Sequence, residues 1–180
     1  MAINETAIPG VLEITSKVFE DSRGWFMESF SQKQSDIVYV QDNHSFSLLK
    51  GTLRGLHCQI RPFAQAKLML VITGAAMDVV VDARRGSPMF GKWITTELSE
   101  ENKKQLFIPH GCLHGFVTLR DNTRVAYKCD NYYSPEHERA VLWNDPFFGI
   151  DWGVVDPVIS PKDAAAPLFK DSDVDFIWER

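Results

Sequence analysis

The amino-acid sequence predicts an all-β protein, a jelly-roll sandwich or barrel with a few short helices. Many short runs alternate apolar with polar residues, as strands with one buried face do. Turn-forming residues separate these runs at fairly regular spacing, and helical periodicity is weak. Short strands spaced in this way are typical of β-sandwiches and barrels, of which the jelly roll is among the commonest.

The expected elements follow one another with turns between them. We expect strands at residues 12–15, 24–30, 68–72, 77–82, 92–98, 105–108, 115–119 and 124–128, and turns at 73–74, 85–88, 109–111 and 134–135. Residues 32–35 and 164–170 are candidate short helices. The tail 171–180 is acidic and then aromatic, so it either frays or packs Phe176 and Trp178 into a groove.

Size and composition predict a single folded domain over residues 1–180. Hydrophobic residues make up 44% of the chain and aromatic residues 12%, which is typical of a globular protein with a sizeable core. The net charge of −5 and the absence of a basic stripe argue against nucleic-acid binding. A few local cations would still suffice to bind an anionic small molecule.

The cysteines and the apolar runs of the chain indicate where in the cell the protein is found. Cys58, Cys112 and Cys129 are odd in number and form no Cys-x-x-Cys pair, so neither a disulfide framework nor a thiolate metal site is indicated. The amino terminus lacks a basic region followed by an apolar core, and no apolar run approaches the length of a membrane span. We therefore expect a cytoplasmic protein with no membrane partner.

The segment 53–59, Leu-Arg-Gly-Leu-His-Cys-Gln, is the most informative stretch when it is read with Lys67. An imidazole that titrates near neutrality can remove a modestly acidic proton, and flanking cations can hold an anion or an enolate. A lone strand histidine is more often a hydrogen-bonded structural residue. Strand alternation also places Arg54 and His57 on opposite faces, so only a bulge or turn at Gly55 would bring both side chains together.

A second cluster begins at residues 109–116, Pro-His-Gly-Cys-Leu-His-Gly-Phe, which partly match the second motif of the cupins. In metal-bearing cupins this histidine joins a His-x-His pair and a carboxylate from the first motif. Here His57 has no histidine two residues on, and no glutamate follows it at positions 60–63. Because a first-row metal requires about three ligands or more from this set, metal binding is not expected.

Two further residues have both a structural and a functional interpretation. Tyr127 is either a buried aromatic with a satisfied hydroxyl or a proton donor whose pKa the neighbouring cations would lower from about 10. Asp163 either caps the short helix that begins at Ala164 or orients His57 and raises its basicity.

Together these segments resemble the dTDP-4-dehydrorhamnose 3,5-epimerase family over nearly the whole chain. The clearest matching stretches are 53–57, 82–88, 98–102, 109–116, 132–138 and 143–146, between 21–26 at one end and 160–163 at the other. The resemblance implies a cupin fold, a homodimer that exchanges amino-terminal strands, and catalysis on a dTDP-4-keto-6-deoxy sugar without metal or nicotinamide cofactor.

The resemblance also implies site residues. His57 would be the base, Asp163 its partner, Tyr127 the acid on the opposite face of the sugar, and Lys67 a neighbour of the C4 oxygen. Residues implied in substrate binding are Gln41, Asp42, Asn43 and Ser45 on a loop, Arg54, His114, Glu138, Lys162, and Arg23, Phe26 and Glu28 near the amino terminus, of which Arg23 and Glu28 would come from a neighbouring subunit.

Alternatives remain open at this point. Cys58 replaces the family's usual aromatic residue, and the bulky segment 60–64 precedes Gln65, so the sugar and the number of inverted carbons are not fixed. A monoepimerase acting at C3 or C5 alone would exchange one proton with solvent. A metal-dependent cupin would carry iron, manganese or zinc, and a catalytically silent sugar-binding cupin would bind nucleotide without exchange.

Overall fold

The computed structural model describes residues 1–179, and strands dominate it. The elements are β1 (Ala2–Glu5), β2 (Leu12–Thr15), β3 (Val18–Asp21), β4 (Gly24–Met27), η1 (Gln32–Gln34), β5 (Gln41–Ser47), β6 (Thr52–Gln59), β7 (Lys67–Thr73), β8 (Ala75–Asp82), β9 (Trp93–Ser99), β10 (Lys104–Ile108), β11 (Cys112–Thr118), β12 (Thr123–Cys129), β13 (Glu138–Ala140), β14 (Val158–Ile159), α1 (Pro161–Ala164) and η2 (Phe169–Asp171). The prediction of an all-β protein with a few short helices is confirmed.

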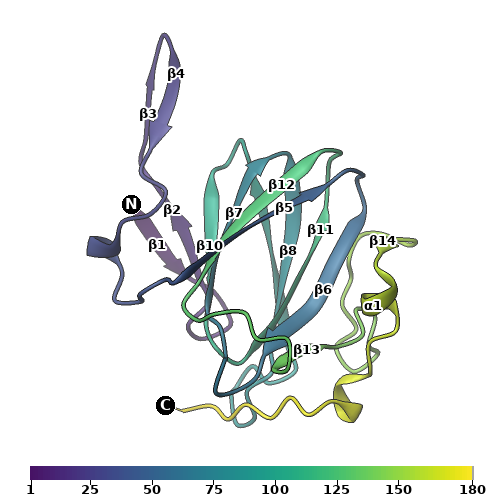
Figure 1. Ribbon diagram of the computed structural model, residues 1–180. Helices are drawn as coiled ribbons and strands as arrows, with labels where there is room; N and C mark the ends of the chain where they lie inside the picture. Colours follow the sequence, from purple (N-terminus) through teal and green to yellow (C-terminus); the bar gives the residue numbers. More distant parts are fainter. Residues whose placement is uncertain (180) are drawn as a thin grey trace.

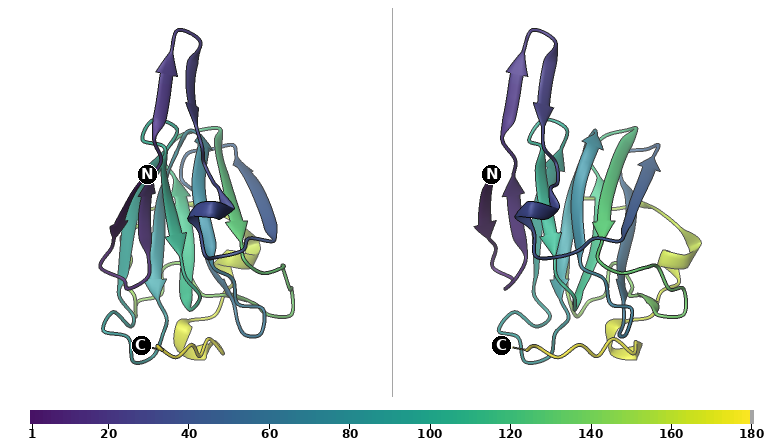
Figure 2. Two further views of the ribbon diagram at one scale, coloured as in Figure 1. Left: turned by 90° about the vertical axis from the view of Figure 1, so that its left-hand side faces the viewer. Right: turned by 60° about the vertical axis from the view of Figure 1, so that its left-hand side comes forward.

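Two sheets pack face to face, and a separate hairpin projects beyond them (Figure 1). The first sheet has the order β1-β2-β10-β7-β12-β5, and the second has the order β13-β6-β11-β8-β9 with β14 parallel to β6. Strands β3 and β4 pair only with each other and extend away from the sandwich in both views of Figure 2.

The apolar core has two layers. Met69 and Val71 of the first sheet pack against Val80 of the second, between the two sheets. On the other face of the second sheet, Val79 and Val81 lie in a cluster that the carboxy-terminal segment covers with residues such as Trp152, Phe148 and Phe169. Strand β8 is therefore buried on both faces, which explains the nearly continuous apolar sequence of residues 75–82.

Several elements differ from the sequence-based prediction. Strands β1, β3, β5, β13 and β14 were not predicted, and the strand expected at 24–30 ends at Met27. Strand β5 is polar except at Phe46 (Gln-Asp-Asn-His-Ser-Phe-Ser), so it lacks the apolar alternation that marks a strand, although its burial alternates. The two strands near the carboxy terminus are only two and three residues long.

The helix expected at 164–170 is wrong in its position. Helix α1 occupies Pro161–Ala164, and Ser160 is its N-cap, with the Ser160 hydroxyl accepting the N–H of Asp163 at 3.1 Å. Proline at the first helical position favours a start at this point. Asp163 is therefore inside the helix and is not its cap. The 3-10 turn at Gln32–Gln34 agrees with the turn expected at 32–35.

The tail packs against the body as far as it is described. Phe176 is buried, and Ile177 forms a parallel bridge with Arg85. The Arg84 guanidinium lies 4.3 Å from the centroid of the Trp178 ring, a cation–π contact. Arg180 lies outside the described residues. Among residues 1–179, no helix is long and apolar enough to cross a membrane.

Candidate functional site

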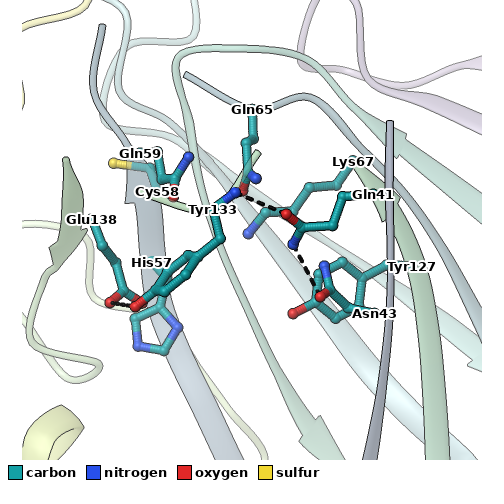
Figure 3. A pocket seen from close by; sticks show the side chains of 10 residues that line it. All are labelled: Gln41, Asn43, His57, Cys58, Gln59, Gln65, Lys67, Tyr127, Tyr133 and Glu138. Atoms are coloured by element: carbon teal, nitrogen blue, oxygen red, sulfur yellow. Dashed lines mark hydrogen bonds between the residues drawn. The ribbon is translucent and has the colours of Figure 1, made fainter. Parts of the chain in front are cut away.

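A polar cavity opens between the two sheets. Two adjoining hollows, of about 350 and 530 Å³, share His57, Lys67, Tyr127 and Glu138 in their linings. His57 projects from β6 of the second sheet, whereas Lys67 and Tyr127 project from β7 and β12 of the first (Figure 3). The cavity thus has an imidazole on one wall and an ammonium and a phenol on the other.

His57 forms a close pair with Asp163. Its Nε2 lies 2.7 Å from Asp163 Oδ1, and Asp163 Oδ2 accepts the N–H of Gly55 at 3.3 Å. Burial alone would raise the pKa of Asp163, but the hydrogen bond and charge of His57 and the N–H of Gly55 outweigh it, so the pKa lies below its usual value. An ionised carboxylate therefore fixes the imidazole ring and places a negative charge beside it.

This lowered pKa predicts a pH dependence of stability. Because the carboxylate is favoured in the folded state, its contribution is fully present above about pH 5 and is lost as the pH falls below the usual 3.8 toward the folded-state pKa. We expect the difference in free energy of unfolding between the wild type and Asp163→Asn to be constant near neutrality and to shrink in acid. Urea titrations between pH 3 and 7 measure it, and a difference that grows in acid would contradict the pairing.

An irregularity in strand β6 at Gly55 lets Arg54 and His57 line the same cavity. Gly55 has φ +128°, and the pairing of β6 with β11 shifts register beside it. A Cβ at this position would lie 2.5 Å from the Cα of Gly115. The irregularity that the sequence required at Gly55 is therefore confirmed, and glycine is the residue that both the backbone angle and the close approach demand.

Substituting Gly55 is expected to destabilise the fold. Gly55→Ala should lower the free energy of unfolding by about 2–4 kcal/mol, because it adds both an unfavourable φ and a backbone clash. Gly24→Ala is the matched control, since Gly24 has φ +130° but its added methyl group would meet nothing within 4 Å. Equal losses in the two variants, measured by urea denaturation, would show that the close approach to Gly115 is unimportant.

Lys67 and Tyr127 face His57 from the first sheet. The Lys67 ammonium is 5.9 Å from the centroid of the Tyr127 ring. Burial raises the pKa of Tyr127 above 10, and the opposing effect of Arg54 is smaller. The expectation that neighbouring cations would lower this pKa is therefore wrong, because desolvation of the phenolate outweighs them. The phenol keeps its proton at neutral pH and can act as a donor.

His114 is buried on β11, directly opposite His57 in the register of the two strands. Its Nε2 lies 2.9 Å from Asp78 Oδ1. Burial lowers the pKa of His114, although Asp78 opposes this effect. The Asp78 carboxylate fixes the His114 ring, which lines the cavity.

Strand β5 divides its four candidate residues between two faces. Gln41, Asn43 and Ser45 line the cavity, which explains why inward positions of this strand are polar. Asp42 points the other way, and its Oδ1 accepts from Lys128 Nζ at 2.8 Å. These residues lie on a strand and not on the loop that the sequence suggested, and the structure does not bring Asp42 to the cavity.

Arg23, Phe26 and Glu28 do not line the cavity of their own chain. Arg23 and Phe26 lie on the projecting β3–β4 hairpin, where Phe26 is 69% exposed, and Glu28 follows β4 and accepts a hydrogen bond from Gln34. By contrast, Glu138 and Lys162 meet at the cavity, with Lys162 Nζ 2.5 Å from Glu138 Oε2.

Tyr133 was not predicted as a site residue, although it lies within the matching stretch 132–138. The Tyr133 hydroxyl donates to Glu138 Oε2 at 2.9 Å, and its backbone N–H donates to Gln41 Oε1 at 2.8 Å (Figure 3). The cavity lining also includes Cys58, Gln59 and Gln65. Across residues 1–179, no group of three or more His, Cys, Asp or Glu side chains is arranged to hold a metal ion.

Comparisons with known proteins identify the family of this chain. The chain matches the dTDP-4-dehydrorhamnose 3,5-epimerase family over residues 5–171. The dTDP-4-dehydrorhamnose 3,5-epimerase of Shigella flexneri is 48% identical over 179 residues, which cover 96% of this chain and 98% of that protein.

Solved structures are similar over the same length. The dTDP-6-deoxy-D-glucose-3,5-epimerase of Legionella pneumophila, in complex with dTDP-4-keto-L-rhamnose, has a TM-score of 0.93 at 42% identity and covers 99% of both chains. A 3′-monoepimerase of Streptomyces bikiniensis, in complex with dTDP-quinovose, has a TM-score of 0.86 at 32% identity over 92% of this chain and 86% of that one. The cupin-like jelly-roll fold is therefore confirmed, and the chain belongs to the dTDP-4-dehydrorhamnose 3,5-epimerase family.

Proposed function

We propose that this protein inverts C3 and C5 of a dTDP-linked 4-keto-6-deoxyhexose, a step in the synthesis of rhamnose-type deoxysugars. One observation carries the proposal: the His57–Asp163 pair and the Tyr127 phenol, which keeps its proton at neutral pH, face one cavity from opposite sheets. Inversion of a carbon needs a proton to leave from one face and to return on the other.

The residue types suit an enolate mechanism. The C4 ketone acidifies the C–H bonds at C3 and C5, His57 removes a proton, and the electron pair moves to O4. Lys67 stabilises the negative charge that develops on this oxygen. Tyr127 then delivers a proton to the opposite face of the carbon. The sugar is neither oxidised nor reduced overall, so the reaction calls for no redox cofactor.

Polar side chains around the cavity supply binding groups for the rest of the substrate. We assign Arg54 and His114 to the sugar and phosphate region, and Gln41, Asn43, Ser45, Glu138 and Lys162 to the rest of the cavity wall. All of these residues line the two hollows. A guanidinium suits a diphosphate because it donates to two oxygens at once.

The projecting hairpin supports a homodimer in which each subunit lends residues to the other. Trp25 and Phe26 are 54% and 69% exposed at a hairpin that contributes nothing to its own cavity. Large apolar side chains exposed together mark an interaction site. We propose that Arg23, Phe26 and Glu28 complete the neighbouring subunit's nucleotide site. We place the dimer in the cytoplasm, in keeping with three cysteines that form no disulfide.

Double epimerisation is favoured over a monoepimerase. The relatives described as 3,5-epimerases reach 49% identity, whereas the described 3′-monoepimerase is 32% identical. The test is to incubate the protein with dTDP-4-keto-6-deoxyglucose in deuterated water and to measure the mass of the sugar nucleotide by mass spectrometry. We expect a gain of two non-exchangeable deuterons. A gain of one would identify a monoepimerase, and no gain would overturn the proposed activity.

Lys67 is expected to act mainly on the chemical step. Lys67→Met should lower kcat by about 10²–10³-fold, because the variant loses the charge beside the developing enolate. Lys104→Met is the control, since Lys104 pairs with Glu13 and lines neither hollow of the cavity. Steady-state kinetics compare the two, and a Lys67→Met variant with unchanged kcat would contradict the assigned role.

A further inference from the structure

The rim of the cavity includes a segment that no strand supports. Residues 130–137 connect β12 to β13 and form neither strand nor helix, yet they carry Tyr133, which is 54% exposed. Despite this exposure, the Tyr133 hydroxyl makes a specific hydrogen bond to Glu138 in the cavity wall. Because backbone outside a ladder needs other partners, the groups that bind 131–134 determine where Tyr133 lies.

One buried carboxamide binds the backbone on both sides of Tyr133. Gln59 Nε2 donates to the carbonyl of Tyr132 at 3.1 Å, and Gln59 Oε1 accepts the N–H of Ser134 at 2.7 Å. The same Nε2 also donates to the carbonyl of Phe63 at 2.6 Å. Gln59 therefore ties the segment that carries Tyr133 to the loop that follows β6.

Other contacts join these two segments. Gln65 Nε2 donates to the carbonyl of Asn131 at 2.7 Å, and Asn131 Nδ2 donates to the carbonyl of Pro62 at 3.3 Å. The Phe63 ring also contacts the His137 ring, with centroids 4.7 Å apart. Residues 60–64 do not line the cavity themselves. They support the segment that does.

We infer that Gln59 is a positioning residue for substrate binding: its carboxamide fixes the peptides on either side of Tyr133 and so holds Tyr133 and Glu138 in the wall of the cavity. The inference rests on the proposed function, because it assigns a binding role within that site. Gln59 acts through Tyr133, not on the reacting carbons, so its loss raises KM and leaves kcat nearly unchanged.

The test is the steady-state kinetics of Gln59→Met, which conserves side-chain length and removes all three hydrogen bonds. We expect KM for dTDP-4-keto-6-deoxyglucose to rise about tenfold and kcat to stay within about twofold. Asn102→Leu is the matched control. Asn102 is also an amide that makes three backbone hydrogen bonds, but in the β9–β10 turn, outside the cavity. This control should lower the thermal midpoint without changing KM.

A double-mutant cycle with Tyr133→Ala separates positioning from direct contact. If Gln59 acts through Tyr133, adding Gln59→Met to Tyr133→Ala changes KM by less than about twofold. An equal effect in both backgrounds would show that Gln59 contacts the substrate itself and would overturn the inference, as would an unchanged KM in Gln59→Met.

Three further outcomes are decisive. Should Gln59→Met fail to fold, Gln65→Met removes a single bond of the same network, and an unchanged KM in that variant would overturn the inference. If the wild-type protein turns over and only the predicted KM effects are missing, the inference fails alone. If the wild type has no activity on the substrate, the proposed function fails and the inference fails with it.

Discussion

Replacing His57 with asparagine is expected to lower kcat by about 10³–10⁴-fold, the largest effect of any single substitution in the cavity. Asparagine cannot accept a proton near neutral pH, so neither carbon would lose its hydrogen. The Asp163 carboxylate would remain in this variant. Its assigned role is to orient His57, so it cannot replace the missing base. Deuterium incorporation from heavy water, measured at both carbons, should fall together with the rate of inversion.

His110→Asn is the matched control for this substitution. His110 is also paired with an aspartate, its Nε2 being 2.8 Å from Asp130 Oδ2, but it lies outside the cavity. We expect near-normal turnover in this variant. Substantial exchange in His57→Asn, with His110→Asn unaffected, would mean that another group is the base.

Replacing Tyr127 with phenylalanine is expected to separate exchange from inversion. The variant keeps His57, so protons at the acidified carbons should still exchange with solvent. Without Tyr127, however, the new proton would be added to the face from which the first one left. Inversion should slow by about 10²–10³-fold, whereas exchange with retained configuration continues. Because burial raises the pKa of Tyr127, the wild-type rate should not fall through loss of this proton until the pH exceeds 10.

Tyr39→Phe removes the same hydroxyl from a half-buried tyrosine outside the cavity. Burial raises the pKa of Tyr39 to about 12, so the two residues are comparable phenols in different places. Near-normal inversion is expected in this control. Equal losses of exchange and inversion in Tyr127→Phe would indicate that Tyr127 acts before the proton leaves, contrary to its assigned role.

The sequence predicted most of the residues that line the cavity, but not all of the strands that hold them. His57 and Asp163 lie 106 residues apart, and the resemblance paired them correctly in space. Their contact depends on β14, which runs parallel to β6 with Val158 opposite Thr52 and so brings α1 beside Gly55. A two-residue strand leaves too little pattern for sequence analysis to detect.

The predictions that were wrong or missing also depend on tertiary structure that the local sequence does not show. Strand β5 was missed because its inward residues line a cavity and are therefore polar. The pKa of Tyr127 was expected to move down because cations are visible in the sequence, whereas burial is not. The contacts of Gln59 join it to backbone at Tyr132, 73 residues along the chain, and local sequence contains no signal for such a contact.

Proton NMR of the sugar nucleotide in deuterated water is the sharpest test of whether this protein inverts both C3 and C5. The wild-type protein, given dTDP-4-keto-6-deoxyglucose, should remove the signals of both H3 and H5 and yield product inverted at both carbons, and His57→Asn should do neither. If both signals persist in the presence of wild-type protein that binds the nucleotide, the protein is not an epimerase of this sugar.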